Sequence, residues 1–157
     1  MAVKIGLVGC GAIGAEIARA LDRGTINATL VAVCDHNPDT ASALIERMEH
    51  KPVKACLEEL VGLADIVVEA ASQKAVPAVA RAALGRGKSL MIMSVVALAD
   101  RELFAEVKRL AADKGARVYL PSGAIAGLDG LKSASLGGIR SITLTTTKNP
   151  RGLQGAP

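Results

Sequence analysis

The sequence predicts an α/β fold in which a doubly wound parallel sheet is covered by helices on both faces. Three observations predict it. Short apolar runs alternate with helical patterns from residue 3 to residue 120. Half of the residues are hydrophobic, and most of those are aliphatic, which suits a sheet buried on both faces. The first apolar run leads through closely spaced glycines directly into a helical pattern.

The elements follow from the apolar periodicity and from the glycines that interrupt it. Predicted strands cover residues 3–8, 28–34, 52–55, 65–70, 89–93 and 117–120. Predicted helices cover residues 15–23, 38–49, 57–61, 75–84 and 100–114. Asp100 is the expected N-cap of the last helix, and Gly115 its expected end. This alternation predicts parallel strands joined by right-handed crossovers.

The glycines after the first strand have the spacing G-x-G-x-x-G, in the stretch Gly9-Cys10-Gly11-Ala12-Ile13-Gly14. Between a strand and a helix, this spacing is the dinucleotide-binding fingerprint of a Rossmann-type domain. Gly9 permits the tight turn, Gly11 lets the backbone approach a pyrophosphate, and Gly14 lets the helix pack on the strand. The first N–H groups of the helix, around Ala12 and Ile13, are free to bind phosphate oxygens.

Asp35 ends the second strand, 21 positions after Gly14. The fingerprint expects a carboxylate there that accepts hydrogen bonds from the adenosine ribose. A carboxylate repels a 2′-phosphate, so Asp35 favours NAD over NADP. The nearby basic residues His36, Arg47 and Lys51 weaken this preference, because one of them could meet a phosphate. Alternatively, Asp35 is only a turn or helix-capping residue.

Ser72 and Gln73 follow the strand at 65–70. Ligands of doubly wound sheets bind at the carboxyl ends of the strands, so both are candidates for cofactor contacts. Ser72 could instead, or in addition, cap the helix at 75–84.

The composition changes after Leu120. Residues 121–130 are rich in small residues and follow a strand, which places them at the ligand end of the sheet. A short helix to about Ser135 should follow, and residues 140–148 alternate like a half-buried antiparallel strand. We therefore expect a cofactor-binding domain at 1–121. Residues 122–157 should begin an incomplete α+β domain.

Charge and cysteine content exclude several classes of protein. The net charge is +4, but basic residues are scattered and aromatic residues are rare, which argues against nucleic-acid binding. Cys10, Cys34 and Cys56 indicate neither a disulfide framework nor a metal site, and Cys10 and Cys34 should be small core residues. Neither a secretory signal nor a membrane span is apparent, so a cytoplasmic protein is expected.

Five segments occur in the order seen in L-aspartate dehydrogenases, and the resemblance covers essentially the whole chain. The segments are Gly9–Gly14, Glu69–Gln73, Ala97–Asp100, Pro121–Asp129 and Thr145–Pro150. The resemblance implies NAD- or NADP-dependent oxidation of L-aspartate to iminoaspartate, which feeds de novo NAD synthesis. It also implies a homodimer or a higher homo-oligomer. The chain departs from the pattern at Val96, where relatives often carry Gly or Ser.

The resemblance also assigns residues to the site. Ala124 should lie against the nicotinamide end of the cofactor, in a pocket shaped by Ser122 and Gly123. Ser122 and Lys148 are candidates for substrate contacts, although Lys148 could equally be an exposed lysine at a strand end. The catalytic histidine of the family lies beyond the equivalent of Pro157, so no catalytic residue is assigned in this chain. We expect the 157 residues alone to bind NAD weakly and to turn over aspartate negligibly.

Two other functions fit the same residues. One is a related dehydrogenase or reductase that resembles dihydrodipicolinate reductase or homoserine dehydrogenase. The other is an NAD-binding module without catalysis. A substrate panel separates the first from an aspartate dehydrogenase, and cofactor binding without turnover would indicate the second.

Overall fold

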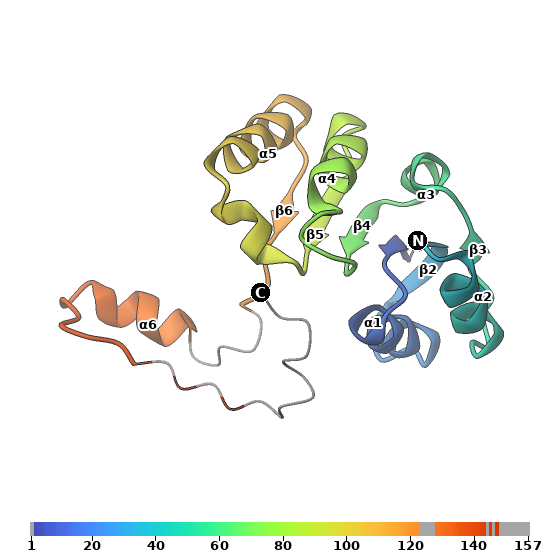
Figure 1. Ribbon diagram of the computed structural model, residues 1–157, viewed down its shortest axis with the longest axis horizontal. Helices are drawn as coiled ribbons and strands as arrows, with labels where there is room; N and C mark the ends of the chain where they lie inside the picture. Colours follow the sequence, from blue (N-terminus) through green and yellow to red (C-terminus); the bar gives the residue numbers. More distant parts are fainter. Residues whose placement is uncertain (1, 123–127, 144, 146, 148–157) are drawn as a thin grey trace. The chain divides into compact units, whose positions relative to one another are not determined.

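The computed structural model describes residues 2–122, 128–143, 145 and 147, and the chain divides into two compact units, 1–121 and 122–157. The first unit contains a parallel sheet of six strands in the order β3-β2-β1-β4-β5-β6 (Figure 1). The strands are β1 (Val3–Val8), β2 (Ala28–Cys34), β3 (Val53–Lys54), β4 (Ile66–Glu69), β5 (Ser89–Ile92) and β6 (Val118–Tyr119). The predicted parallel sheet is confirmed.

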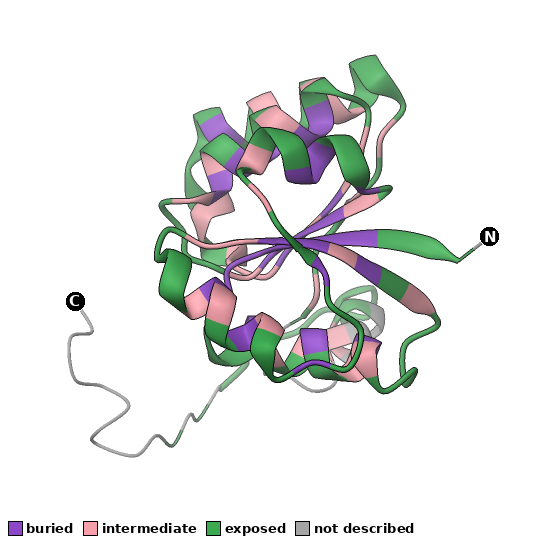
Figure 2. Cartoon of the chain, turned by 90° about the vertical axis from the view of Figure 1, so that its right-hand side faces the viewer, coloured by how far each residue is buried: buried purple, intermediate pink, exposed green. Residues whose placement is uncertain are grey.

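Helices cover both faces of this sheet, as Figure 2 shows with the strands crossing between two helical layers. The helices of the first unit are α1 (Ala12–Asp22), α2 (Pro38–Glu46), α3 (Leu57–Leu63), α4 (Val76–Gly85) and α5 (Arg101–Lys114), with the 3₁₀ helix η1 (Val95–Ala99). The chain runs outward from β1 through β3, returns to β4, and continues the other way to β6. The winding therefore reverses between β1 and β4, which makes this gap the switch point where ligands of such sheets bind.

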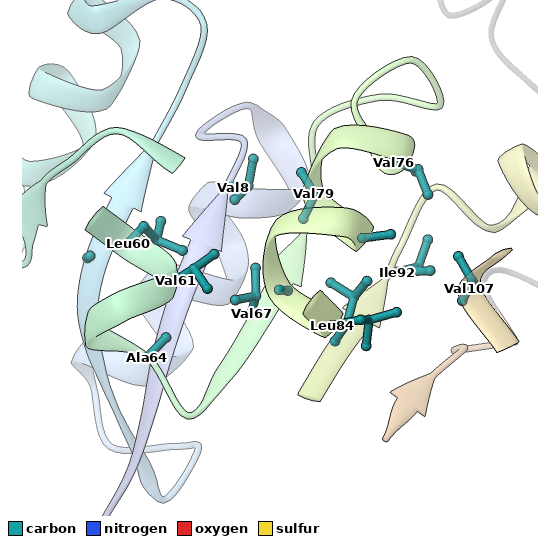
Figure 3. Packing of buried hydrophobic residues seen from close by; sticks show 14 of the residues in the cluster. Val8, Leu60, Val61, Ala64, Val67, Val76, Val79, Leu84, Ile92 and Val107 are labelled. Atoms are coloured by element: carbon teal, nitrogen blue, oxygen red, sulfur yellow. The ribbon is translucent and has the colours of Figure 1, made fainter. Parts of the chain in front are cut away.

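Two aliphatic clusters hold the layers to the sheet. On one face, Leu60 and Val61 of α3 and Val79 of α4 gather over Val67 of β4, and all four are buried (Figure 3). On the other face, α1 and α2 contribute Ala18, Leu21, Ala41 and Leu44, which pack with β1 and β2. Aliphatic side chains buried on both faces explain why the predicted strands are continuous apolar runs.

Several helices begin or end at residues other than those predicted. Helix α1 begins at Ala12, inside the glycine motif and three residues before the predicted start. Helix α2 ends at Glu46 rather than at residue 49, and the Lys51 ammonium donates to the carbonyl oxygens of Ile45 and Glu46. The caps of α5 are as predicted: the Asp100 carboxylate accepts from the first-turn amides, and Gly115 adopts a φ of 62°.

The second unit contains the expected short helix, α6 (Leu128–Ser135). The predicted strand at 140–148 is wrong for the part of it that the structure describes: residues 140–143, 145 and 147 form no strand, and Ile142 is 58% exposed. Strands gain stability by pairing, and the described part of this unit offers no strand as a partner. In the described residues, no helix has the length and apolar character needed to cross a membrane.

Candidate functional site

The carboxyl ends of parallel strands meet at one edge of the sheet, and the loops after β1, β2, β4 and β5 lie there. Gly9 follows β1, and Asp35 follows β2. Ser72 follows β4, and Ser94 follows β5. The fold therefore brings four of the loops that follow strands to the switch point.

Gly9 and Gly14 make the loop after β1 as tight as predicted. Gly9 has a φ of +97°, and a Cβ added to it would lie 2.6 Å from the carbonyl carbon of Ala70 and from the Cα of Ala71. The loops after β1 and β4 therefore touch at this point. A Cβ on Gly14 would overlap the carbonyl oxygen of Gly9, so the first turn of α1 closes directly on the loop.

Gly11 has the opposite environment. A Cβ added to it would meet no atom within 4 Å, and the residue is exposed together with Ala12 and Ile13. Gly11 is the N-cap of α1 and supplies no side chain to the first amides of that helix. Open space in front of free helix amides suits the phosphates of a dinucleotide, so the residues present fit such a cofactor.

The Asp35 carboxylate connects the loops after β1 and β2. Its Oδ2 accepts from the backbone N–H of Cys10 at 2.7 Å, and its Oδ1 accepts from the N–H of Asn37 at 2.9 Å. The side chain is only 7% exposed, while the neighbouring His36 ring, 3.0 Å from Oδ1, is 96% exposed. Each carboxylate oxygen has two lone pairs; Oδ1 already has two partners, whereas Oδ2 has one and can still accept a further donor. Asn37, not Asp35, is the N-cap of α2.

Ser72 and Gln73 are exposed in the loop after β4, next to the glycine turn. The alternative role of Ser72 as a helix cap is wrong. Helix α4 begins at Val76, its N-cap is Ala75, and no side chain caps it. The backbone carbonyl of Ser72 instead accepts from the amide of Ala75. Among the described residues, neither side chain forms a hydrogen bond within the protein, so both are available to contact a ligand.

Glu69 was not predicted as a site residue. It ends β4 and is fully buried, and it receives hydrogen bonds from Ala71, Ser72 and Ser94 in the loops after β4 and β5. A signal for it was present in the sequence, because a carboxylate that ends a run as apolar as Ile66-Val67-Val68 must be buried or functional. Val96, where the chain departs from the L-aspartate dehydrogenase pattern, lies on η1 after β5 and is 67% exposed.

Of the residues predicted from 122 onward, only Ser122 lies in the described part of the chain, and it is exposed in the second unit. Gly123, Ala124 and Lys148 lie outside the described residues. The predicted contacts of these residues with cofactor and substrate therefore stay predictions.

A cavity of about 470 Å³ is lined by residues of α1 and α2. Cys10 lines it together with the side chains of Arg19 and Arg47. Of the basic residues near Asp35, Arg47 thus lines the cavity. The Lys51 ammonium instead donates to the carbonyl oxygens of Ile45 and Glu46 at the end of α2. Lys51 is therefore the least suited of the three to meet a 2′-phosphate.

Cys10 and Cys34 do not form a reactive centre. Burial raises the pKa of the Cys10 thiol to about 12, and the Asp35 charge acts in the same direction. Burial also raises the pKa of Cys34, which is half-buried, and Cys10 is a core residue as predicted. No cluster of three His, Cys, Asp or Glu side chains suited to a metal ion occurs in the described part of the chain.

The strand order, with a glycine turn that leaves the amides of α1 open at the switch point, is that of a Rossmann-type dinucleotide-binding domain. This is the class that the fold and the site define. Residues 9–121 match the family described as the NAD-binding domain of homoserine dehydrogenase, and the chain belongs to that family.

Relatives of known name are similar over nearly all of the chain. The L-aspartate dehydrogenase of Methanocella arvoryzae is 51% identical over 98% of this chain and 57% of its own length. That of Methanosarcina barkeri is 47% identical over 99% of this chain and 58% of its own length. The chain thus spans a little over half the length of these relatives.

Solved structures share the fold. The myo-inositol dehydrogenase of Lactobacillus casei, in complex with NAD(H) and myo-inositol, aligns with a TM-score of 0.73 at 23% identity. The alignment covers 88% of this chain and 42% of that one. The biliverdin reductase of Synechocystis, in complex with biliverdin and NADP+, aligns with a TM-score of 0.68 at 23% identity, over 87% of this chain and 42% of that one. At these identities, the likeness concerns the fold alone.

Proposed function

We propose that this chain is the cofactor-binding part of an L-aspartate dehydrogenase, which oxidises L-aspartate to iminoaspartate with NAD or NADP. The assignment of L-aspartate as the substrate rests on the identity of 51% to a protein of that name over 98% of the chain. The observation that supports the cofactor is independent of it, namely the open N-terminus of α1 at the switch point.

The described residues account for binding and orientation of the cofactor. The amides at Ala12, Ile13 and Gly14 would hold the pyrophosphate, since the first amides of a helix have no partner inside it. Asp35, beside β2, would hold the adenosine ribose, which directs the other half of the dinucleotide toward β4 and β5. When bound, the cofactor supplies a hydride acceptor for the substrate Cα.

Asp35 supports a preference for NAD. Its buried carboxylate would stand where a 2′-phosphate has to lie, and like charges repel strongly at a partly desolvated site. His36 is the nearest basic side chain, but it is almost fully exposed and already directed at Oδ1. We therefore assign NAD as the preferred cofactor.

The rest of the reaction needs a base and cations that hold the substrate carboxylates. Ser122, with Gly123 and Ala124, would form the nicotinamide end of the pocket, and Lys148 would hold a carboxylate. Neither histidine of the chain suits the base, because His36 lies beside Asp35 on the adenosine side and His50 lies beside Asp22 at the end of α1. We place the base outside these 157 residues, as the resemblance implies.

Further parts of the proposal concern the whole protein. Residues 122–157 would begin the catalytic and oligomerisation domain, and the protein would act as a homodimer or a higher homo-oligomer. The product iminoaspartate would enter de novo NAD synthesis in the cytoplasm.

Calorimetric titration of the 157-residue chain with NAD and NADP tests whether the chain binds the cofactor. A chimera of this chain with the remaining part of the Methanocella arvoryzae relative tests the assignment to the dehydrogenase. We expect the chimera to form NADH with aspartate and the chain alone to form almost none. A folded chimera that binds no cofactor would contradict the proposal, and NADH formation by the chain alone would contradict the placement of the base.

A second candidate is a homoserine dehydrogenase-like enzyme, favoured by the family description that residues 9–121 match. Assays of the chimera and of the protein made from its natural gene, with aspartate, homoserine and dihydrodipicolinate as substrates, would distinguish an aspartate dehydrogenase from a homoserine dehydrogenase-like enzyme. Tight NAD binding without turnover of any of the three would indicate a binding module.

A further inference from the structure

Glu69 is the one fully buried charged side chain in the described part of the chain. It ends β4, directly beside the switch point between β1 and β4. Burial of a carboxylate is costly unless hydrogen bonds replace its water, so a buried carboxylate calls for an explanation. Cofactor binding as proposed above does not use it.

Four donors surround the Glu69 carboxylate, and they come from two different loops. Oε1 accepts from the N–H of Ala71 at 2.9 Å, from the N–H of Ser72 at 3.0 Å and from the Ser94 hydroxyl at 3.0 Å. Oε2 accepts from the N–H of Ser94 at 3.0 Å. Glu69 thus joins the loop after β4 to the loop after β5.

All four of these groups are donors, which is the pattern that an ionised carboxylate requires. All four are also neutral. Among the described residues, no lysine, arginine or histidine forms an ion pair with Glu69. The hydrogen bonds therefore stabilise the negative charge but leave it uncompensated, and a charge in a buried position acts over a longer distance than one in water.

The position of this charge relative to a bound dinucleotide follows from the topology, and here the inference rests on the proposed function. The pyrophosphate belongs at the N-terminus of α1, and Asp35 marks the adenosine side at β2. The nicotinamide half must then extend to the other side of β1, over the ends of β4 and β5. The two loops that Glu69 joins are the loops at those ends.

We propose that Glu69 is a specificity-determining residue that makes the site favour the oxidised cofactor. The nicotinamide ring of NAD+ carries a positive charge, and the ring of NADH does not. A fixed, uncompensated carboxylate beneath the two loops attracts the charged ring and leaves the neutral ring unaffected. Glu69 would thereby hold the cofactor in the state that accepts a hydride from the substrate.

The test compares the dissociation constants of NAD+ and NADH for the 157-residue chain and for the variant Glu69→Gln. A glutamine keeps the shape, and its carbonyl oxygen can retain the three bonds that Oε1 accepts. Its amide nitrogen cannot accept the Ser94 N–H that Oε2 accepts, and this local loss should affect both cofactors alike. We expect the ratio of the NAD+ constant to the NADH constant to rise by about three- to tenfold, since only the charged ring loses an attraction. An unchanged ratio would overturn the proposal.

Two controls separate charge from structure. Ser94→Ala removes one donor but keeps the carboxylate, so it should weaken both cofactors alike and leave the ratio unchanged. Asp113→Asn removes the same charge from an exposed position in the last turn of α5, and it should change neither constant. A ratio that shifts equally in Glu69→Gln and Ser94→Ala would assign Glu69 to loop structure alone and overturn the proposal.

A fallback variant covers the case in which Glu69→Gln does not fold. The pair Glu69→Met with Ser94→Ala removes the carboxylate and the Ser94 hydroxyl together, while the amides of Ala71, Ser72 and Ser94 lose their acceptor. It should show the same rise in the ratio. If neither variant folds, Glu69 serves folding and the proposal is overturned. If the unaltered chain binds neither cofactor, the proposed function itself has failed, which is a distinct result.

Discussion

The backbone N–H of Cys10 donates to Oδ2 of Asp35 at 2.7 Å, across 25 residues of sequence. The bond joins the glycine loop after β1 to the end of β2. A residue expected to bind the ribose therefore also fixes the loop expected to bind the phosphates. Because one side chain is linked to both positions, a change at Asp35 affects more than the ribose contact.

Asp35→Ser should weaken NAD binding much more than NADP binding. The variant loses a charge-assisted hydrogen bond to the ribose, which corresponds to about a 10- to 100-fold loss of affinity for NAD. For NADP, the loss is offset because the negative charge that repels the 2′-phosphate is gone. Calorimetric titration with both cofactors measures the two changes.

Asp65→Ser is the matched control for Asp35→Ser. Asp65 also accepts a backbone N–H bond, from Lys4 at 2.9 Å, but it lies at the opposite edge of the sheet. The control should leave both affinities unchanged. Equal losses for NAD and NADP in Asp35→Ser would mean that Asp35 only supports the glycine loop and does not contact the ribose.

Two alanine substitutions in the glycine motif should separate binding from folding. Gly11→Ala places a methyl group in open space, so its stability should fall by no more than about 1 kcal/mol, the cost of alanine at an N-cap. Its affinity for NAD should fall on the order of tenfold, because the methyl group stands where the pyrophosphate approaches the backbone.

Gly14→Ala should instead destabilise the fold, since its methyl group overlaps the carbonyl oxygen of Gly9. We expect a loss of about 1–3 kcal/mol, in the range of overpacked cores. Urea unfolding and NAD titration of both variants measure the contrast. If Gly11→Ala bound NAD as tightly as the unaltered chain, the phosphate site would have to lie elsewhere.

Much of the first unit could be predicted because its determinants are local. Apolar runs such as Leu30–Val33, and caps such as Asp100 and Gly115, fix strands and helix ends without knowledge of the fold. The glycine spacing specified its own turn, since Gly9 and Gly14 are in conformations or contacts that other residues do not tolerate.

Glu69 and the segment at 140–148 could not be predicted in the same way. The role of Glu69 depends on Ser94, 25 residues away, which is brought to it only by the pairing of β4 with β5. The alternation at 140–148 predicts a strand, but a strand also requires a neighbour, and residue pattern alone does not supply one. The alternative role of Ser72 as a cap fails because α4 begins only at Val76, with Ala75 as its N-cap.

The thiols should differ strongly in reactivity. With a pKa of about 12, Cys10 has about a thousandfold less thiolate at pH 8 than an ordinary cysteine. Cys56 is exposed and should react rapidly with a disulfide reagent. One thiol per native chain should thus react rapidly with the reagent, and the variant Cys56→Ser should lose this rapid reaction. All three cysteines should react in urea. Fast reaction of Cys10 in the native chain would contradict its burial against the sheet.

Stability should depend on pH through Asp22, at the end of α1. Its carboxylate accepts from the amides of His50 and Glu49, at 2.8 Å each, and these bonds lower the pKa of Asp22 in the folded chain. A carboxylate with a lowered pKa stabilises the fold above its ordinary pKa of about 4, and that stabilisation is lost as the pH falls through the folded value. Asp22→Asn should therefore be less stable than the unaltered chain at pH 7, and the difference should narrow toward pH 3. Urea unfolding midpoints at the two pH values measure it. A difference that stays constant or widens on acidification would show that the charge of Asp22 does not hold the end of α1 to residues 49 and 50.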